Sequence, residues 1–312
     1  MSENTEQSEE ISSGQRAVED LLHMLELGPG EMKNGEETFD ALTLNRESRR
    51  IYGGQVLAQA IVAGAQTVEK DRTLHSIHGL FVRPGDVDQN LQFGVRTLND
   101  GRSFSTRRIQ AYQDAQEIFS SVASYQAASR GVEHSTPMPE NIPDPESLPT
   151  VADLVGHVPL PIARAIAFER PFDLRHVEQP LWLSADAKNS PTTAVWFKTF
   201  APLVDDPAVH QAAIAYASDY VPVEPGLRAH GKYWLEQGMN VASLDHTIWF
   251  HRPARADEWL LYVLESPSAQ DARSLAIGKI FSAEGEHVAT VAQESMLRLP
   301  EFREDFTSSY KQ

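Results

Sequence analysis

The sequence contains no cysteine, has few basic residues, and has no long apolar run. The absence of cysteine excludes disulfides, thiolate-bound zinc and a cysteine nucleophile, and it fits a cytoplasmic protein. The 27 Lys and Arg residues face 44 Asp and Glu residues, which leaves a formal net charge of −17. Because such a charge repels polyanions, no nucleic-acid partner is expected. The chain also lacks the roughly 20 consecutive apolar residues of a membrane-spanning helix, and its polar, acidic start is not a signal peptide, so no membrane partner is expected.

What the sequence does contain is an internal repeat. Residues 74–84, LHSIHGLFVRP, end in the same pattern as residues 241–253, VASLDHTIWFHRP. Residues 123–126, ASYQ, match residues 290–293, TVAQ, at nearly the same spacing along the chain. Two matches in nearly the same register indicate a duplication, and 312 residues are enough for two domains of ordinary size.

Each half is predicted to contain a helix followed by a run of antiparallel strands. Apolar residues recur at helical spacing in some segments, while β-branched and aromatic residues dominate others. The expected helices lie at 15–27, 53–68 and 210–220, and the expected strands at 39–44, 74–82, 90–98, 103–113, 117–126, 168–177, 193–200, 241–252, 258–265, 273–282 and 287–297. This order predicts an α+β fold in each half, with a helix packed against a curved sheet. Residues 193–200 and 224–240 have no clear counterpart in the first half.

The prolines and the charged ends suggest how the chain is divided. Prolines crowd into the stretch between the two halves, which is typical of a surface connection, and the polar first residues lack the apolar side chains of a folded segment. The expected order is a disordered acidic tail (1–15), an N-terminal domain (16–128), a Pro-rich linker (129–165), a C-terminal domain (166–305) and a short tail (306–312).

Several longer motifs resemble the acyl-CoA thioesterase II (TesB-type) family. They are GGQVLAQA, LHSIHGLFVRPGD, DGRSFSTRRI, YASD, SLDHTIWFHRP, EWLLYVLESPSA and VAQE, and they extend over nearly the whole chain. The resemblance implies a tandem, or double, hotdog fold, in which each half wraps an antiparallel sheet around a long helix. It also implies hydrolysis of a fatty acyl-CoA, of medium to long chain, to free fatty acid and CoA in lipid metabolism. It implies that the reaction needs neither a metal nor an organic cofactor. It also implies that the chain assembles into a homodimer or homotetramer.

The resemblance also assigns catalytic residues. The family's Asp, Thr or Ser, and Gln fall on Asp219 of YASD, Ser243 before the DH pair, and Gln293 of the last strand. Many family members have Thr where this chain has Ser243, but the hydroxyl group is kept. These residue types suit the reaction, because a carboxylate can take a proton from an attacking water while a hydroxyl and an amide orient it.

Two further sets of residues are candidates for binding the substrate. Gly54 and Gln55 follow Gly53 at the start of the expected helix, where main-chain N–H groups can stabilise an oxyanion. A cluster of basic residues can bind the phosphates of CoA, and it consists of Arg102, Arg107 and Arg108.

Each of these residues also has an ordinary structural interpretation. Taken alone, Asp219 is a helix end, and Ser243 and Gln293 are hydrogen-bonded strand residues; only their joint match favours catalysis. A Ser-His-Asp triad that includes His246 or His251 is disfavoured, because the sequence has no G-x-S-x-G motif. Two other functions stay open: a hotdog enoyl-CoA hydratase and a non-catalytic acyl-CoA-binding module. Gln126, the repeat partner of Gln293, is predicted to be structural, because no acid precedes it as Asp219 precedes Gln293.

Overall fold

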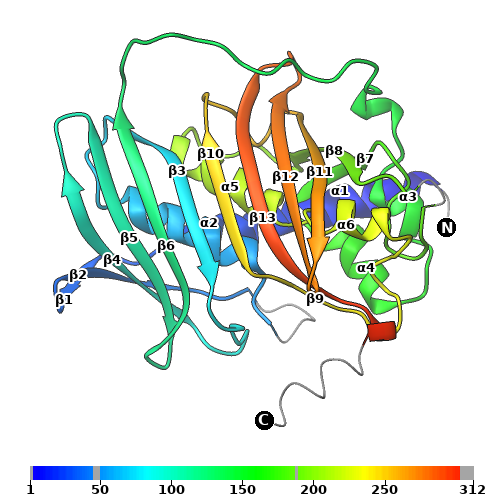
Figure 1. Cartoon of the computed structure of the whole chain (residues 1–312), viewed down its shortest axis with the longest axis horizontal. Coiled ribbons are helices and arrows are strands. Elements are labelled where there is room, and N and C mark those ends of the chain that lie inside the picture. Colours follow the sequence, from blue (N-terminus) through cyan, green and yellow to red (C-terminus); the bar gives the residue numbers. More distant parts are fainter. Residues whose placement is uncertain (1–2, 45–49, 187–188, 303–312) are drawn as a thin grey trace.

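A single long antiparallel sheet connects the two halves of the chain in this computed structural model, which describes residues 3–44, 50–186 and 189–302 (Figure 1). The helices are α1 (Glu3–Leu25), α2 (Gly53–Ala65), α3 (Val151–Val155), α4 (Pro161–Phe168), α5 (Pro207–Ser218) and α6 (Glu224–Ala229), with 3₁₀ turns at Pro145–Ser147 and Pro300–Phe302. The strands are β1 (Glu31–Lys33), β2 (Glu36–Ala41), β3 (Arg72–Phe81), β4 (Leu91–Asp100), β5 (Phe104–Gln113), β6 (Gln116–Ala127), β7 (Phe172–His176), β8 (Thr192–Thr199), β9 (Asn240–Ser243), β10 (Asp245–Phe250), β11 (Leu260–Gln270), β12 (Arg273–Ser282) and β13 (His287–Arg298).

The strand order has the symmetry that the repeat predicts. Within the described residues the order is β1-β2-β4-β5-β6-β3-β10-β13-β12-β11-β8-β7, and the second six strands mirror the first six. The halves join where β3 pairs with β10, with Ile77 opposite Ile248. Because β8 occupies the place of β2, residues 193–200 do have a counterpart, contrary to the sequence-based expectation. The sequence similarity had decayed there while the strand pairing persisted.

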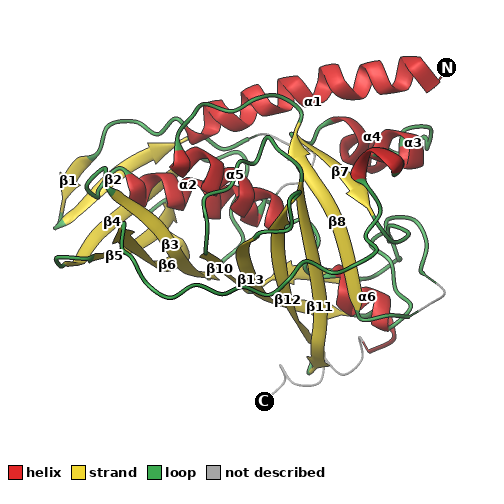
Figure 2. Cartoon of the chain, turned by 90° about the horizontal axis from the view of Figure 1, so that it is seen from above, coloured by secondary structure: helices red, strands yellow, loops and turns green. Residues whose placement is uncertain are grey.

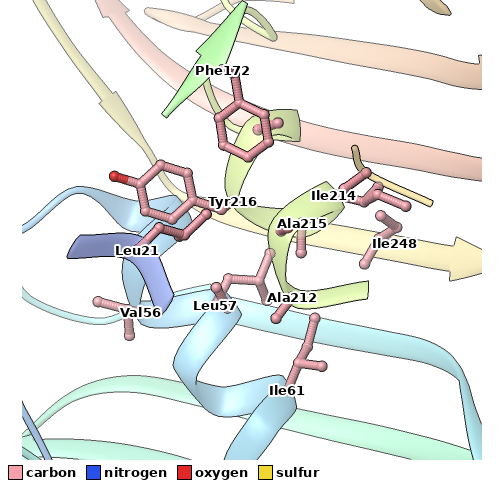
Figure 3. Packing of buried hydrophobic residues seen from close by; sticks show 14 of the residues in the cluster. Leu21, Val56, Leu57, Ile61, Phe172, Ala212, Ile214, Ala215, Tyr216 and Ile248 are labelled. Carbon is pink, nitrogen blue, oxygen red and sulfur yellow. The ribbon is translucent and has the colours of Figure 1, made fainter. Parts of the chain in front are cut away.

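The central helices α2 and α5 pack against each other on one face of the sheet (Figure 2). Every residue of α2 from 54 to 64 is buried, and most of these residues are apolar or alanine. Leu57 and Ile61 of α2 approach Ala212 and Ala215 of α5, where the small side chains allow close approach of the two helices (Figure 3). The helix pair therefore belongs to one core that both halves share.

Helix α1 lies over the central helices on the side away from the sheet (Figure 2). It buries Val18, Leu21 and Met24 in the shared core. The helix begins at Glu3, so the expectation of a disordered tail over residues 1–15 is wrong for the described part of that segment. Glu and Gln are good helix formers, and the buried Gly14 lies against the ring of Phe200, where a Cβ would come within 2.1 Å of the ring.

The expected linker over residues 129–165 contains local structure. A long connection crosses from β6 toward α3 (Figure 1), and the indole Nε1 of Trp196 donates to the carbonyl of Pro143 at 3.0 Å. Helix α3 then begins with a capping box between Thr150 and Asp153, and α4 begins with Pro161 in its first turn. Some of the prolines and polar residues that suggested a linker are thus helix start signals. The expected tail at 306–312 lies outside the described residues.

The strand expected at 241–252 is interrupted, and this interruption shapes the site. Ser243 at the end of β9 is opposite Ser295, whereas Thr247 in β10 is opposite Ala292. The chain around Leu244 therefore contains one residue more than β13 over the same distance, which makes a β-bulge. Bulges redirect neighbouring side chains, and here the interruption immediately follows Ser243.

Candidate active site

The two central helices pack side by side, with the start of α2 beside the end of α5, and this contact brings residues from both halves together. The main-chain N–H of Gly54, at the start of α2, donates to Oδ2 of Asp219 at 2.8 Å. Asp219 caps the C-terminal end of α5, and Tyr52 Oη donates to the carbonyl of Tyr216 at 2.8 Å. A Cβ on Gly53 would lie 2.8 Å from Oδ2 of Asp219, and one on Gly54 would lie 2.6 Å from the Tyr216 carbonyl. The paired glycines are therefore needed for this close approach.

The three predicted catalytic residues form one chain of hydrogen bonds. Ser243 Oγ donates to Oδ1 of Asp219 at 2.9 Å. Gln293 Nε2 donates to Ser243 Oγ, also at 2.9 Å. These residues come from the end of α5, the end of β9 and the middle of β13, and the bulge after Ser243 lies beside them. The structure thus brings the predicted set together, and it adds the main-chain N–H of Gly54 as a second hydrogen-bond donor to the carboxylate.

The environment of Asp219 makes its carboxylate more basic than usual. Burial raises the pKa of Asp219 from 3.8 to about 6, although the hydrogen bonds from Ser243 and Gly54 act in the opposite direction. A carboxylate with this pKa is ionised at neutral pH and takes a proton more readily than an exposed aspartate does. The site therefore has the electrostatics of a general base.

A pocket of about 580 Å³ opens beside Asp219. Gly53 and Ser243 also line it, so the polar group lies on the pocket wall. Most of the remaining wall is apolar, and it includes Ile51, Val56, Phe81, Ile118, Phe119, Ile166, Trp182, Val223, Trp234 and Val241. Among the residues that the structure describes, three arginines also line the pocket, and they are Arg50, Arg83 and Arg170. An apolar pocket with a few convergent polar groups is the usual form of a small-molecule site.

A second pocket of about 730 Å³ lies at the other end of α5 and includes Gln126, the repeat partner of Gln293. At the end of α2, the residue that corresponds to Asp219 is Gln66, which caps the helix. The end of α2 therefore lacks an acid at the position that Asp219 has at the end of α5. The prediction that Gln126 is structural agrees with this arrangement.

The two residues predicted to hold an oxyanion already have hydrogen-bond acceptors for their main-chain N–H groups. The N–H of Gly54 is directed to Asp219. The N–H of Gln55 donates to the carbonyl of Tyr52 at 3.1 Å. Among the described residues, the N–H of Gly53 has no such acceptor, and Gly53 lines the pocket. The oxyanion role of Gly54 and Gln55 stays a prediction. The N–H of Gly53 is a further candidate donor for an oxyanion.

The arginines predicted to bind CoA do not line the pocket beside Asp219. Arg107 is only 2% exposed and donates to Asp100 at 2.8 Å and to Thr67 at 2.9 Å. Its charge is thus used inside the fold, so the structure gives Arg107 a structural role instead. Arg108 donates to Glu36 at 3.4 Å and Arg102 is exposed, so their binding role stays a prediction. Sequence reasoning did not assign a substrate role to the arginines of the pocket wall, because basic residues far apart in the sequence give no local signal.

Neither histidine of the strand motif forms a Ser-His-Asp triad. His246 is buried and bonds Gln293 and Ser218, not Ser243 or Asp219. The ring of His251 bonds Thr290 at 2.8 Å. Among the described residues, no group of three His, Asp or Glu side chains is placed to hold a metal ion, and no helix combines the length and the apolar character needed to cross a membrane.

Comparison with known proteins places this site in a family. Residues 43–126 match the family described as the acyl-CoA thioesterase N-terminal domain, and residues 138–297 match the acyl-CoA thioesterase C-terminal domain. The chain is 36% identical to acyl-CoA thioesterase 2 of Haemophilus influenzae over 295 residues, which cover 91% of this chain and 99% of that protein. It is 34% identical to human acyl-coenzyme A thioesterase 8 over 264 residues, covering 81% of this chain and 82% of that protein.

A solved structure agrees with these matches. The structure of acyl-CoA thioesterase II TesB2 of Mycobacterium marinum is 36% identical in sequence and superposes with a TM-score of 0.73. The alignment covers 90% of this chain and 98% of that chain. The fold and site thus define a double-hotdog thioesterase. The chain belongs to the TesB-type acyl-CoA thioesterase II family, and it is an acyl-CoA thioester hydrolase. The tandem hotdog fold class and the acyl-CoA thioester hydrolysis expected from the sequence are confirmed.

Proposed function

We propose that the enzyme hydrolyses fatty acyl-CoA by the attack of a water molecule that Asp219 deprotonates and that Ser243, itself oriented by Gln293, holds in place. The observation that carries this proposal is the continuous hydrogen-bond chain from Gln293 through Ser243 to a half-buried carboxylate on the pocket wall. A thioester needs no stronger nucleophile, because its carbonyl is electrophilic and its thiolate leaves readily.

The hydrogen-bond inventory defines where the water can bind. The Ser243 hydroxyl donates its single hydrogen to Asp219 and accepts one hydrogen from Gln293, which leaves one lone pair on Oγ. A water that donates one hydrogen to the Asp219 carboxylate and the other to this lone pair has both hydrogens anchored. The oxygen lone pairs of that water then face the pocket. Such orientation removes rotational freedom from the attack.

The reaction then follows in two steps. The water oxygen bonds to the acyl carbon as one of its protons moves to Asp219, and negative charge develops on the carbonyl oxygen. The Gly53 N–H, at the positive end of α2, is the donor best placed to stabilise this charge. The C–S bond next breaks, the fatty acid forms, and the proton held by Asp219 returns to the departing CoA thiolate. Asp219 is thereby ionised again for the next turnover.

The wall of the pocket supports a fatty acyl substrate. Its apolar side chains, with aromatic rings from Phe81, Trp182 and Trp234, suit a hydrocarbon chain of medium to long length. Arg50 and Arg83 lie on the wall of the same pocket, where their positive charge suits the phosphates of CoA. We further propose a cytoplasmic enzyme of lipid metabolism that assembles as a homodimer or homotetramer, which would cover exposed sheet edges.

Thiol release from a series of acyl-CoAs, measured with Ellman's reagent, tests this proposal. We expect release that increases from short to longer acyl chains and that Asp219→Ala abolishes. Asp114→Asn is a matched control, because Asp114 is an exposed turn residue with φ 46°, a conformation that Asn adopts readily. Full activity in the Asp219→Ala enzyme would refute the assigned base. Tight binding of acyl-CoA without thiol release would instead indicate a binding module.

A further inference from the structure

The hydrogen-bond chain of the active site continues beyond the three predicted catalytic residues to His246 on β10. The Nδ1 atom of His246 lies 2.5 Å from Oε1 of Gln293, and its Nε2 atom lies 2.9 Å from the hydroxyl of Ser218. His246 has no exposed surface and Gln293 is 1% exposed, so solvent does not compete for these bonds. Neither nitrogen of the ring reaches Asp219 or Ser243, so His246 can act on the site only through its neighbours.

The chemistry of the partners fixes the direction of each bond. An amide oxygen only accepts, so the hydrogen between His246 and Gln293 belongs to Nδ1 of the histidine. Burial lowers the pKa of His246 to about 4, so the ring is neutral at neutral pH and its Nε2 is an acceptor. The Ser218 hydroxyl lies 2.9 Å from both Nε2 and the carbonyl of Ala215, so its single hydrogen is shared between these two acceptors.

The orientation of the Gln293 side chain is consistent with this tautomer. With Oε1 directed at His246, the NH₂ group faces the hydroxyls of Ser243 at 2.9 Å and Ser295 at 3.1 Å. Both amide hydrogens are thus donated, and the Ser243 hydroxyl is left to donate to Asp219. All the donors point the same way, from His246 toward the carboxylate.

We propose that His246 is a positioning residue, which holds the Gln293 carboxamide in the orientation that makes Ser243 a donor to Asp219. If the carboxamide turned by half a rotation, its NH₂ group would face the Nδ1–H of His246, donor against donor. Its oxygen would then accept the hydrogen of Ser243 and draw the hydroxyl away from Asp219. The water site described above would be lost with it. The inference deepens the proposed mechanism and rests on it.

A buried histidine can also be a packing residue, and the two roles predict different kinetics. A packing residue contributes to activity independently of Gln293. A positioning residue acts through Gln293, so its removal has no further effect once the carboxamide is gone. The double-mutant cycle of His246→Leu and Gln293→Ala separates these roles. His246→Asn is the rescue variant, because the Asn side-chain NH₂ lies near the position of Nδ1. His210→Leu is the matched control, since His210 is also buried but lies at the opposite end of α5.

Thiol-release kinetics with the full chain test the inference. We expect His246→Leu to lower kcat about 10- to 100-fold, the range found when an outer hydrogen-bond partner of a reacting group is removed, with KM changed less than about threefold. In the Gln293→Ala background we expect a further effect of less than about twofold, and His246→Asn should recover most of the loss. Equal losses in both backgrounds, or an unchanged kcat in His246→Leu, would overturn the inference.

A second measurement does not depend on how well the leucine variant folds. In the wild-type enzyme with ¹⁵N-labelled histidine, NMR should show His246 as the neutral Nδ1–H tautomer, with its signals identified by their loss in His246→Asn. The Nε2–H tautomer would overturn the inference. Failure of the proposed mechanism gives a different result. If the Asp219→Ala enzyme kept its full activity, Asp219 would not be the base, whatever the tautomer of His246.

Discussion

Asp219→Asn should make the protein more stable at neutral pH while it destroys activity. The pKa of Asp219 rises from 3.8, its ordinary value, to about 6 in the folded chain. At 1.36 kcal/mol for each pKa unit, the ionised carboxylate lowers the stability of the fold by about 3 kcal/mol at pH 7. Asn is neutral at every pH. Its side-chain oxygen can accept one of the two hydrogen bonds that Gly54 and Ser243 donate, but its NH₂ group cannot accept the other, and the loss of that bond costs about 1 kcal/mol. The expected net gain at pH 7 is therefore about 2 kcal/mol.

The sign of this effect depends on pH in a defined way. A carboxyl group with a raised pKa in the folded state stabilises the fold below its unfolded pKa and loses that contribution as the pH rises through about 6. The advantage of the Asn variant should therefore vanish near pH 4. Urea unfolding at both pH values measures it, with Asp114→Asn as the control that changes stability by less than about 0.5 kcal/mol. An equal effect at the two pH values, or no gain at pH 7, would refute the reasoning.

Three further predictions concern other parts of the site. Gly54→Ala should lower kcat at least about tenfold and destabilise the fold by about 1–3 kcal/mol, because its Cβ would lie 2.6 Å from the main-chain carbonyl of Tyr216. Gly131→Ala is the control, because no atom lies within 4 Å of its added Cβ, and it should change neither kcat nor the melting temperature. Ser243→Ala should lower kcat about 100-fold. Ser243→Thr keeps the hydroxyl and should retain most activity, so similar kcat values for the two variants would contradict the role of that hydroxyl. Arg83→Gln should raise KM for acyl-CoA and leave kcat unchanged, but it should not affect hydrolysis of the same acyl group on pantetheine, which lacks all of the phosphates. Equal effects on both substrates would exclude a phosphate contact.

Much of the fold and of the catalytic set could be predicted from the sequence, because both depend on local patterns. Strand alternation located the sheet, and the motifs around Asp219, Ser243 and Gln293 pointed to side chains that the structure joins by hydrogen bonds. The start of α1 was missed, because composition alone does not show that Gly14 docks on a ring from another domain.

Other features could not be predicted because they depend on contacts between distant segments. The Gly54 N–H donates to Asp219 only because the start of α2 lies beside the end of α5. Arg107 is buried only because Asp100 and Thr67 surround its guanidinium group, while arginine by itself suggests an exposed position. His246 was recognised in the motif, but its role depends on which atoms of Gln293 and Ser218 it contacts.

The pH dependence of kcat/KM tests the central claim, that Asp219 is the base, most directly. Loss of the ultraviolet absorbance of the thioester follows the reaction at any pH. We expect kcat/KM to rise with pH and reach a plateau with a midpoint near 6, the pKa of Asp219, so that the value at pH 5 is about a tenth of the plateau. In Asp219→Asn this limb should be absent and the remaining activity flat and very low. A limb near pH 6 that persists in the Asn variant would show that another group is the base.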